Sequence, residues 1–197
     1  MNLANKITMS RIFMSLVIIL MLLFPFDQLG INFPSLIING RILMDSKYLI
    51  AGILFIVASL TDYFDGNIAR KYNMITDFGK TLDAISDKIL TNSLIIILAC
   101  QGMVSPIIAV VIVIRDIVVD SLKMIMGSKA GAVGAIKIAK YKTATLMVGL
   151  VLVLFYDLPF SLMGINVGDY VLIVAAILSI ISGVEYYKMA SKYFVTK

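Results

Sequence analysis

The chain has 197 residues, of which 60% are hydrophobic and only 15% are charged, and its mean hydropathy is +1.00. A soluble domain is about half apolar and about one-quarter charged. Several apolar runs of about 20 residues therefore exclude an ordinary soluble domain and predict a polytopic membrane protein. The net charge of +5 fits cytoplasmic loops beside anionic headgroups, and we expect no nucleic-acid partner.

Two residue types that commonly carry catalysis are scarce. The chain has no histidine and a single cysteine, Cys100, which lies inside an apolar run. This composition excludes Ser–His–Asp and Cys–His catalysis, zinc sites built on histidine or cysteine, and an internal disulfide. Any polar chemistry must use aspartate, glutamate, arginine, lysine or hydroxyl groups.

In chain order, the hydropathy pattern predicts a basic segment over residues 1–11 at the membrane interface, followed by six spans. The first apolar run ends at Phe24-Pro25-Phe26 without a small-residue cleavage site, so we interpret it as an uncleaved span. Residues 27–46 and 127–134 carry Gly, Asn, Pro or small polar residues and are predicted to be loops. The predicted spans are 12–26, 47–70, 79–101, 104–126, 137–156 and 170–193. The predicted fold is thus an all-α membrane protein with one catalytic domain over 1–197.

The distribution of basic residues predicts the orientation. Six spans place both termini on one side of the membrane. With that side cytoplasmic, the outward loops hold only Arg41 and Lys47, and the other fifteen of the 17 basic residues lie inside or in the helices leading from inside. The positive-inside rule therefore predicts that both termini are cytoplasmic in a multi-pass protein of the cell membrane.

Four aspartates lie within the second and third predicted spans. Asp62 and Asp65 are three residues apart, and Asp83 and Asp87 are four apart, so each pair shares one helical face. A charge at the centre of a membrane helix costs about 2.5–3.5 kcal/mol on insertion scales, which makes such residues functional candidates. If the two helices pack antiparallel, the four carboxylates surround one small volume towards the cytoplasmic side.

Four carboxylates in one desolvated pocket need neutralisation. Without histidine or cysteine, their hard oxygen ligands favour Mg²⁺, Mn²⁺ or Ca²⁺, and two ions about 3.5–4 Å apart suit phosphoryl transfer. The alternative is that these aspartates form ordinary ion pairs at the membrane edge with Arg70, Lys80 or Lys88.

The residues around the aspartates resemble the full signature of the CDP-alcohol phosphotransferase family. The chain reads Asp-Tyr-Phe-Asp-Gly-Asn-Ile-Ala-Arg over 62–70, then eight residues, then Gly-x3-Asp-x3-Asp over 79–87. The eight matching positions are Asp62, Asp65, Gly66, Ala69, Arg70, Gly79, Asp83 and Asp87. The six-span layout is also similar to that of the family, so the resemblance covers most of the chain.

The resemblance implies a mechanism and a set of roles. It implies two metal ions, Mg²⁺ or Mn²⁺, held by Asp62, Asp65, Asp83 and Asp87, with Asp87 also acting as the general base. The implied donor is CDP-diacylglycerol, whose lipid-side phosphorus is attacked by a hydroxyl while CMP leaves. Residues implied for the nucleotide are Asn5, Thr8, Asp62, Gly66, Ala69, Arg70 and Gly79. Capping of an interfacial helix explains Asn5 and Thr8 nearly as well. The family further implies a homodimer.

Basic residues on the fourth and fifth spans bear on the acceptor. A cluster of arginine and lysine beside a metal site suits an acceptor that carries phosphate, and the candidates are Arg115, Lys123, Lys140 and Lys142. Residues 5–11 and 139–143 resemble the branch that makes phosphatidylglycerophosphate from glycerol 3-phosphate. The departures are Ala4 in place of the usual Pro, Asp116 and Lys123 in place of Glu and Arg, and Ala139 in place of Gly.

Other readings remain open at this point. Within the same reaction class, the second candidate acceptor is inositol phosphate, followed by serine or phosphatidylglycerol. In a different class, intramembrane carboxylates also line the pathways of divalent-cation transporters. Against a transporter, the acidic residues cluster towards one membrane face, with Glu185 also towards the cytoplasmic end, and leave no acidic trail across.

Overall fold

The structure is a computed structural model that describes residues 3–31, 33–38, 42–71, 77–130 and 134–194. Inside these ranges it describes the backbone alone for residues 3–6, 27, 38, 42–43, 62–71, 77–78, 80 and 129–130. The long helices are α1 (Leu3–Leu23), α2 (Ser46–Lys71), α3 (Asp77–Cys100), α4 (Pro106–Ala130), α5 (Lys137–Leu154) and α6 (Val167–Phe194). A short 3₁₀ turn, η2 (Phe160–Met163), joins α5 to α6.

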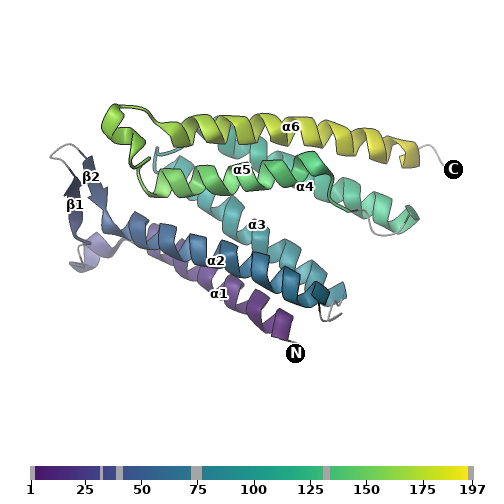
Figure 1. The fold of residues 1–197 in the computed structure, drawn as a ribbon, viewed down its shortest axis with the longest axis horizontal. Coiled ribbons are helices and arrows are strands. Elements are labelled where there is room, and N and C mark those ends of the chain that lie inside the picture. The colour runs from purple at the N-terminus through teal and green to yellow at the C-terminus, as the bar shows by residue number, and fades with distance from the viewer. Residues whose placement is uncertain (1–2, 32, 39–41, 72–76, 131–133, 195–197) are drawn as a thin grey trace.

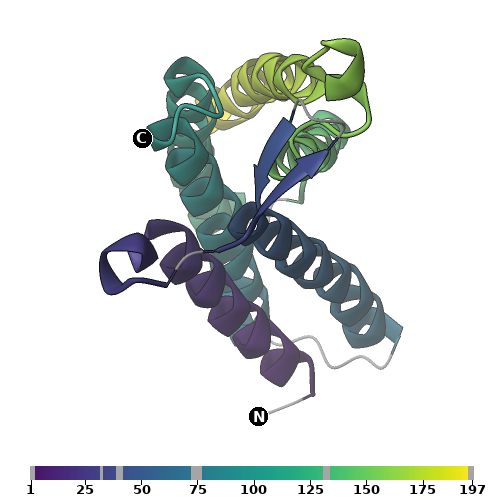
Figure 2. The ribbon, with the colours of Figure 1, turned by 90° about the vertical axis from the view of Figure 1, so that its left-hand side faces the viewer.

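The six helices form two groups of three. Helix α1 packs against both α2 and α3, and α6 packs against both α4 and α5, while α3–α4, α2–α5 and α3–α5 contacts connect the groups (Figures 1 and 2). The groups meet near the short α3–α4 turn, and their axes diverge towards the end where both chain termini lie (Figure 1). Both ends of the chain are thus on the same side of the bundle, as an even number of helices requires.

The end opposite the termini carries a small β-hairpin. After a 3₁₀ turn, η1 (Phe26–Leu29), strands β1 (Ser35–Ile38) and β2 (Ile42–Asp45) pair antiparallel, with Ser35 opposite Asp45. The prediction of a loop over 27–46 was therefore wrong for these residues. Apolar residues precede Asn39-Gly40 and resume after Arg41, and an Asn-Gly dipeptide between such runs is a strong hairpin signal.

The helix bounds agree with the predicted spans to within three residues, apart from two boundaries. Helix α1 begins at Leu3, so the basic segment predicted over 1–11 is largely the first part of α1. Helix α4 continues to Ala130, four residues beyond the predicted end at 126. Among the described residues, one helix, α6, is long and apolar enough to cross a membrane, and the apolar stretches Ile7–Leu23 and Ser46–Thr61 are shorter.

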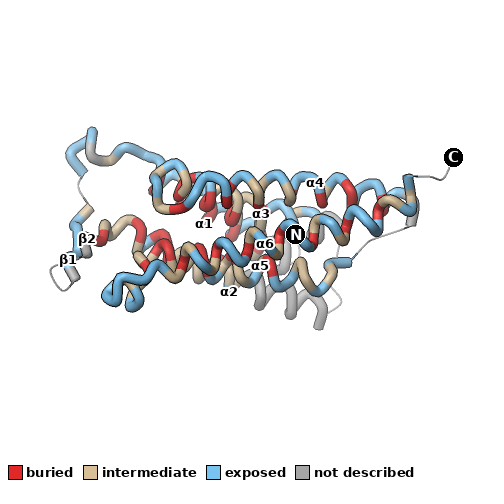
Figure 3. The backbone as a smooth tube through the Cα atoms, turned by 90° about the horizontal axis from the view of Figure 1, so that it is seen from above, coloured by how far each residue is buried: buried red, intermediate tan, exposed pale blue. Residues whose placement is uncertain are grey.

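The hydrophobic core lies in the half of the bundle next to the hairpin. Phe55, Leu98 and Leu150 are fully buried there, among residues contributed by all six helices. Gly149 allows close packing of α5 on α6, because a Cβ at this position would lie 2.6 Å from Leu172 Cδ2. The outward faces of the helices are exposed along their length and carry large apolar residues such as Phe13 and Ile107 (Figure 3).

Candidate active site

The predicted acidic residues lie at the end of the bundle that also holds the termini. Asp62 and Asp65 are in the last three turns of α2, and Asp83 and Asp87 are in the first three turns of α3. Asp62 and Asp65 lie nine and six residues before the end of α2 at Lys71, and Asp83 and Asp87 lie six and ten residues after the start of α3 at Asp77. The meeting of all four carboxylates in one site stays a prediction.

Several predicted site residues lie where the side chains are outside the described part of the chain. On α2 these are Asp62, Asp65, Gly66, Ala69 and Arg70, and on α1 this is Asn5. Their predicted roles with metal and nucleotide stay predictions. Thr8 is described and is buried on α1, and Gly79 lies half-buried in the first turn of α3.

A buried arginine from α1 pairs with the first aspartate of α3. Arg11 donates a hydrogen bond from Nη2 to Asp83 Oδ1, and its side chain is 1% exposed, whereas that of Asp83 is 48% exposed. The Ser15 hydroxyl donates to the Arg11 carbonyl at 2.8 Å, one turn further along α1. The guanidinium thus neutralises a carboxylate that the sequence predicts to bind a metal cation.

Asp87 lies one turn deeper than Asp83 on the same helix. Its charged neighbours are Arg11 of α1, Asp83 of α3, Asp116 of α4 and Lys142 of α5. The Thr91 hydroxyl donates to the Asp87 backbone carbonyl at 2.9 Å. Asp87 is therefore near charged side chains from both helix groups.

A buried ion pair joins α4 to α5. Lys142 Nζ lies 2.8 and 2.9 Å from the two carboxylate oxygens of Asp116, and both residues are buried. Arg115 Nη1 also donates to Asp116 Oδ1 at 2.9 Å. A buried ion pair recovers its desolvation cost only with close geometry and further hydrogen bonds, and both are present here.

Arg115 also ties α4 to α6. It donates from Nε to the Ser179 carbonyl at 3.1 Å and from Nη2 to the Ser182 hydroxyl at 2.7 Å. Its guanidinium lies 5.8 Å from the centre of the Tyr186 ring, and Lys123 Nζ lies 5.0 Å from the same ring. Three of the predicted phosphate-binding residues, Arg115, Lys123 and Lys142, thus gather on α4 and α5.

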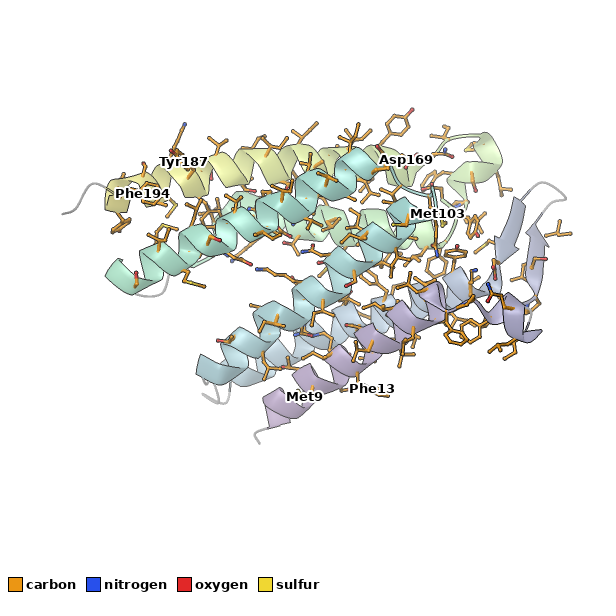
Figure 4. The ribbon with its side chains drawn as sticks, turned by 180° about the vertical axis from the view of Figure 1, so that it is seen from behind. Met9, Phe13, Met103, Asp169, Tyr187 and Phe194 are labelled. Atoms are coloured by element: carbon orange, nitrogen blue, oxygen red, sulfur yellow. The ribbon has the colours of Figure 1, made fainter. Side chains whose placement is uncertain are left out.

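The fourth predicted phosphate-binding residue differs from these three. Lys140 is exposed on α5, two residues before the buried Lys142. A separate pair joins the two helix groups, because Lys88 of α3 forms an ion pair with Asp120 of α4. Oxygen- and nitrogen-tipped side chains are visible between α3 and α4, whereas carbon-only side chains such as Phe13 cover the outer faces (Figure 4).

The charge pattern fits a divalent cation near Asp83 and Asp87. The ligands are hard carboxylate oxygens, and the Arg11 guanidinium already provides a positive charge at one of them. Among the described side chains no three metal-ligating groups come together, because the other two aspartates of the signature are on the part of α2 described by backbone alone. The fit therefore rests on the α3 pair and on the backbone positions of the α2 pair.

Sequence reasoning missed four contributors to this region. Arg11 read as part of a basic flank, and Lys88 read only as a partner for a metal-site aspartate. Ser182 and Tyr186 carry no charge, so nothing in their spacing marked them as partners of Arg115. The usable signal was the position of Arg11, directly before the apolar run that begins at Ile12 and one turn before Ser15.

The described part of the chain is mainly helical, and it places Asp83 and Asp87 of α3 near basic side chains of α1 and α5. The profile of the family described as CDP-alcohol phosphatidyltransferase matches residues 1–181. The chain therefore belongs to this family.

Similar proteins from three bacteria carry the same name. A CDP-diacylglycerol–glycerol-3-phosphate 3-phosphatidyltransferase of Bacillus subtilis is 34% identical over 188 residues, which covers 94% of this chain and 93% of the relative. Proteins of the same name from Rickettsia bellii and Rickettsia felis are 36% and 34% identical, covering 82% and 98% of this chain and 90% and 97% of their own lengths.

Proposed function

We propose that the protein transfers the phosphatidyl group of CDP-diacylglycerol to sn-glycerol 3-phosphate, giving phosphatidylglycerophosphate and CMP. Family membership and the names of the relatives support the reaction. The structural observation that carries the proposal is that the charged neighbours of Asp87 include Asp83, which belongs to the same signature, and Lys142, a predicted phosphate-binding residue. A base with these neighbours suits a donor held at the acidic residues and an acceptor whose phosphate binds the basic ones.

The acidic residues are proposed to hold two divalent ions, Mg²⁺ or Mn²⁺. The ligands would be Asp62, Asp65, Asp83 and Asp87. When bound, the ions supply positive charge that neutralises the diphosphate of the donor. In their absence Arg11 holds Asp83, which limits the repulsion among the carboxylates of this site.

In the proposed reaction, Asp87 accepts the proton of the acceptor's hydroxyl group. The hydroxyl oxygen forms a bond to the lipid-side phosphorus, and the bond from that phosphorus to the bridging oxygen breaks. CMP leaves with the bridging oxygen and its electron pair. Gly66 and Ala69 leave room for the cytidine, and Arg70, Asn5, Thr8 and Gly79 complete the nucleotide site, as the family resemblance implies.

The acceptor's phosphate is proposed to lie against the basic residues of α4 and α5. Lys142 and Arg115 are already aligned there by Asp116, so a phosphate meets two oriented cations. Pre-aligned charged donors lose little rotamer freedom when they bind an anion. Lys123 extends the basic surface towards Tyr186, and Lys140 contributes from the exposed side of α5.

A position in the membrane is part of the proposal. Large apolar residues exposed on every helix need a nonpolar surrounding. An apolar groove of about 290 Å³ lies between α2 and α5 and is lined by residues that include Ile56, Leu60 and Val148. Because Leu60 is only two residues before Asp62, this groove suits an acyl chain of the lipid substrate. We propose a multi-pass protein of the cell membrane with the site towards the cytoplasm.

The test is CMP release from CDP-diacylglycerol by the purified protein in detergent with Mg²⁺. Glycerol 3-phosphate, inositol phosphate, serine and phosphatidylglycerol are supplied one at a time, with EDTA as a control. We expect release with glycerol 3-phosphate and loss of release in EDTA. Release with another acceptor alone would refute the acceptor, and no release by folded protein would favour a divalent-cation transporter. Light scattering on the same sample tests the homodimer that the family implies.

A further inference from the structure

Lys88 occupies an unusual place for a residue with no assigned role. It follows Asp87 directly on α3, and its ammonium group crosses to α4, where it forms an ion pair with Asp120. The side chains of both partners are partly buried, at 34% and 42% exposed. Lys88 is thus a cation that lies beside the proposed base and reaches into the region between the two helix groups.

Three lysines from three helices converge in this region. Besides Asp87 and Asp116, the charged neighbours of Lys88 include Lys123 of α4 and Lys142 of α5. Each lysine has a different partner: Lys142 pairs with Asp116, Lys88 with Asp120, and Lys123 lies over the Tyr186 ring. Asp116 and Asp120 are one turn apart on α4 and therefore on the same face.

The charges in this group do not cancel. Four cations, Lys88, Lys123, Lys142 and Arg115, face the three anions Asp87, Asp116 and Asp120, which leaves a surplus of one positive charge. A phosphate monoester carries a charge of about −1.5 to −2 near neutral pH. The surplus therefore favours an acceptor that carries phosphate, and without Lys88 the group would have no surplus.

We propose that Lys88 is a further binding residue for the acceptor's phosphate and that Asp120 is the counter-ion that holds Lys88 when no acceptor is bound. This inference rests on the proposed function and names one more contact of the same site. Asp120 competes with the phosphate for the ammonium group and repels the phosphate directly. The two members of this ion pair therefore have opposite effects on acceptor binding.

The test compares the opposite changes in KM that are expected for the two residues. In the full-length protein in detergent, KM is measured for glycerol 3-phosphate and for CDP-diacylglycerol in Lys88→Met, Lys88→Arg and Asp120→Asn. We expect Lys88→Met to raise KM for glycerol 3-phosphate by about 10-fold or more, the scale of a lost charged hydrogen bond. We expect Asp120→Asn to lower that KM by about 2- to 5-fold, the scale of one partly exposed charge.

Two controls separate binding from general damage. Lys88→Arg keeps the charge and is expected to stay within about threefold of the wild-type KM. Lys192→Met removes an exposed positive charge from the last turn of α6 and is expected to leave both KM values unchanged. Protection against thermal unfolding by inorganic phosphate, measured without CDP-diacylglycerol, should fall in Lys88→Met and rise in Asp120→Asn.

A purely structural ion pair gives a different pattern. Both single variants would then change KM in the same direction, and the double variant would return towards wild type, which would overturn the inference. Should Lys88→Met fail to fold, an unchanged or raised KM in Asp120→Asn would have the same meaning. Wild-type protein that uses only a phosphate-free acceptor would refute the proposed function and this inference together. Wild-type use of glycerol 3-phosphate with an unchanged KM in Lys88→Met would refute this inference alone.

Discussion

The two halves of the helix bundle are held together by different forces. Next to the β-hairpin, the helices meet through fully buried apolar side chains such as Phe55, Leu98 and Leu150. Towards the termini the two helix groups diverge; there the Lys88–Asp120 ion pair links one group to the other, and the Arg11–Asp83 ion pair links α1 to α3 within one group. A polar ligand cannot replace a buried apolar contact, whereas a charged ligand can take the place of one residue of an ion pair.

The residues that stabilise the fold and the residues proposed to carry the reaction therefore lie in different halves of the same helices. Helix α3 shows it most clearly, because Asp83 and Asp87 lie in its first half and Leu94 and Leu98 in its second. Packing of the apolar half fixes the position of α3 in the bundle. The charged side chains of its other, polar half are held in place by that packing. Substitutions in the two halves should therefore have separable effects.

The largest effect is expected from the polar half. Asp87→Asn removes the proposed base without changing its shape, and we expect CMP release to fall roughly 100- to 10,000-fold, the range for loss of a general base. The melting temperature should change little, because the Asp87 carboxylate faces other charges and no apolar core residue. Activity within threefold of wild type would contradict the role given to Asp87.

The apolar half should give the reverse result. Leu98→Ala removes a side chain that is fully buried, and the expected loss is about 2–5 kcal/mol of unfolding free energy. Denaturant unfolding in detergent measures the loss, and Ile96→Ala, whose side chain is exposed, is the matched control. Turnover per folded molecule should stay near wild type at a temperature where both proteins are folded.

A substitution at the Arg11–Asp83 pair tests whether the polar half responds to cations. Arg11→Met should lower the unfolding free energy by about 1–3 kcal/mol without metal, the scale of a charged hydrogen bond. A divalent cation should then stabilise the variant more than the wild type, since Arg11 no longer competes for Asp83. Melting curves with and without MgCl₂ measure both effects, and equal Mg²⁺ shifts in the two proteins would argue against competition.

The smallest effect concerns a buried carboxyl at the hairpin end, outside the proposed spans. Burial raises the pKa of Asp157 above its ordinary value of 3.8, although the Gly168 N–H donates to it. The folded state therefore favours the protonated form. The unfolding free energy should fall as pH rises from 3.8 to the raised pKa and then level off. The difference between wild type and Asp157→Asn across this range isolates the effect, and a parallel pH dependence would exclude it.

Sequence patterns predicted those features that depend on the spacing of residues within a single helix. Asp62 with Asp65, and Asp83 with Asp87, share faces because of spacing alone, and the helix boundaries followed from apolar runs. The hairpin was missed because its strands are only four residues long, too short to separate from a loop without giving weight to Asn39-Gly40.

The spacing of residues along the sequence could not predict contacts between different helices. Pairing of Arg11 with Asp83, or of Lys88 with Asp120, depends on how each helix is rotated about its axis and how far it is shifted along it. Those two quantities are set by packing in the apolar half, where many aliphatic side chains are interchangeable in sequence. The residue types in the site were therefore predictable, and their partners were not.

The most direct test of the central claim follows one oxygen atom through the reaction. Glycerol 3-phosphate carrying ¹⁸O in its C1 hydroxyl is incubated with CDP-diacylglycerol, Mg²⁺ and the protein, and the products are analysed by mass spectrometry. Attack on the lipid-side phosphorus predicts ¹⁸O in phosphatidylglycerophosphate, with unlabelled CMP in equal amount. Phosphatidic acid together with a labelled cytidine nucleotide would show attack on the other phosphorus and would contradict the account.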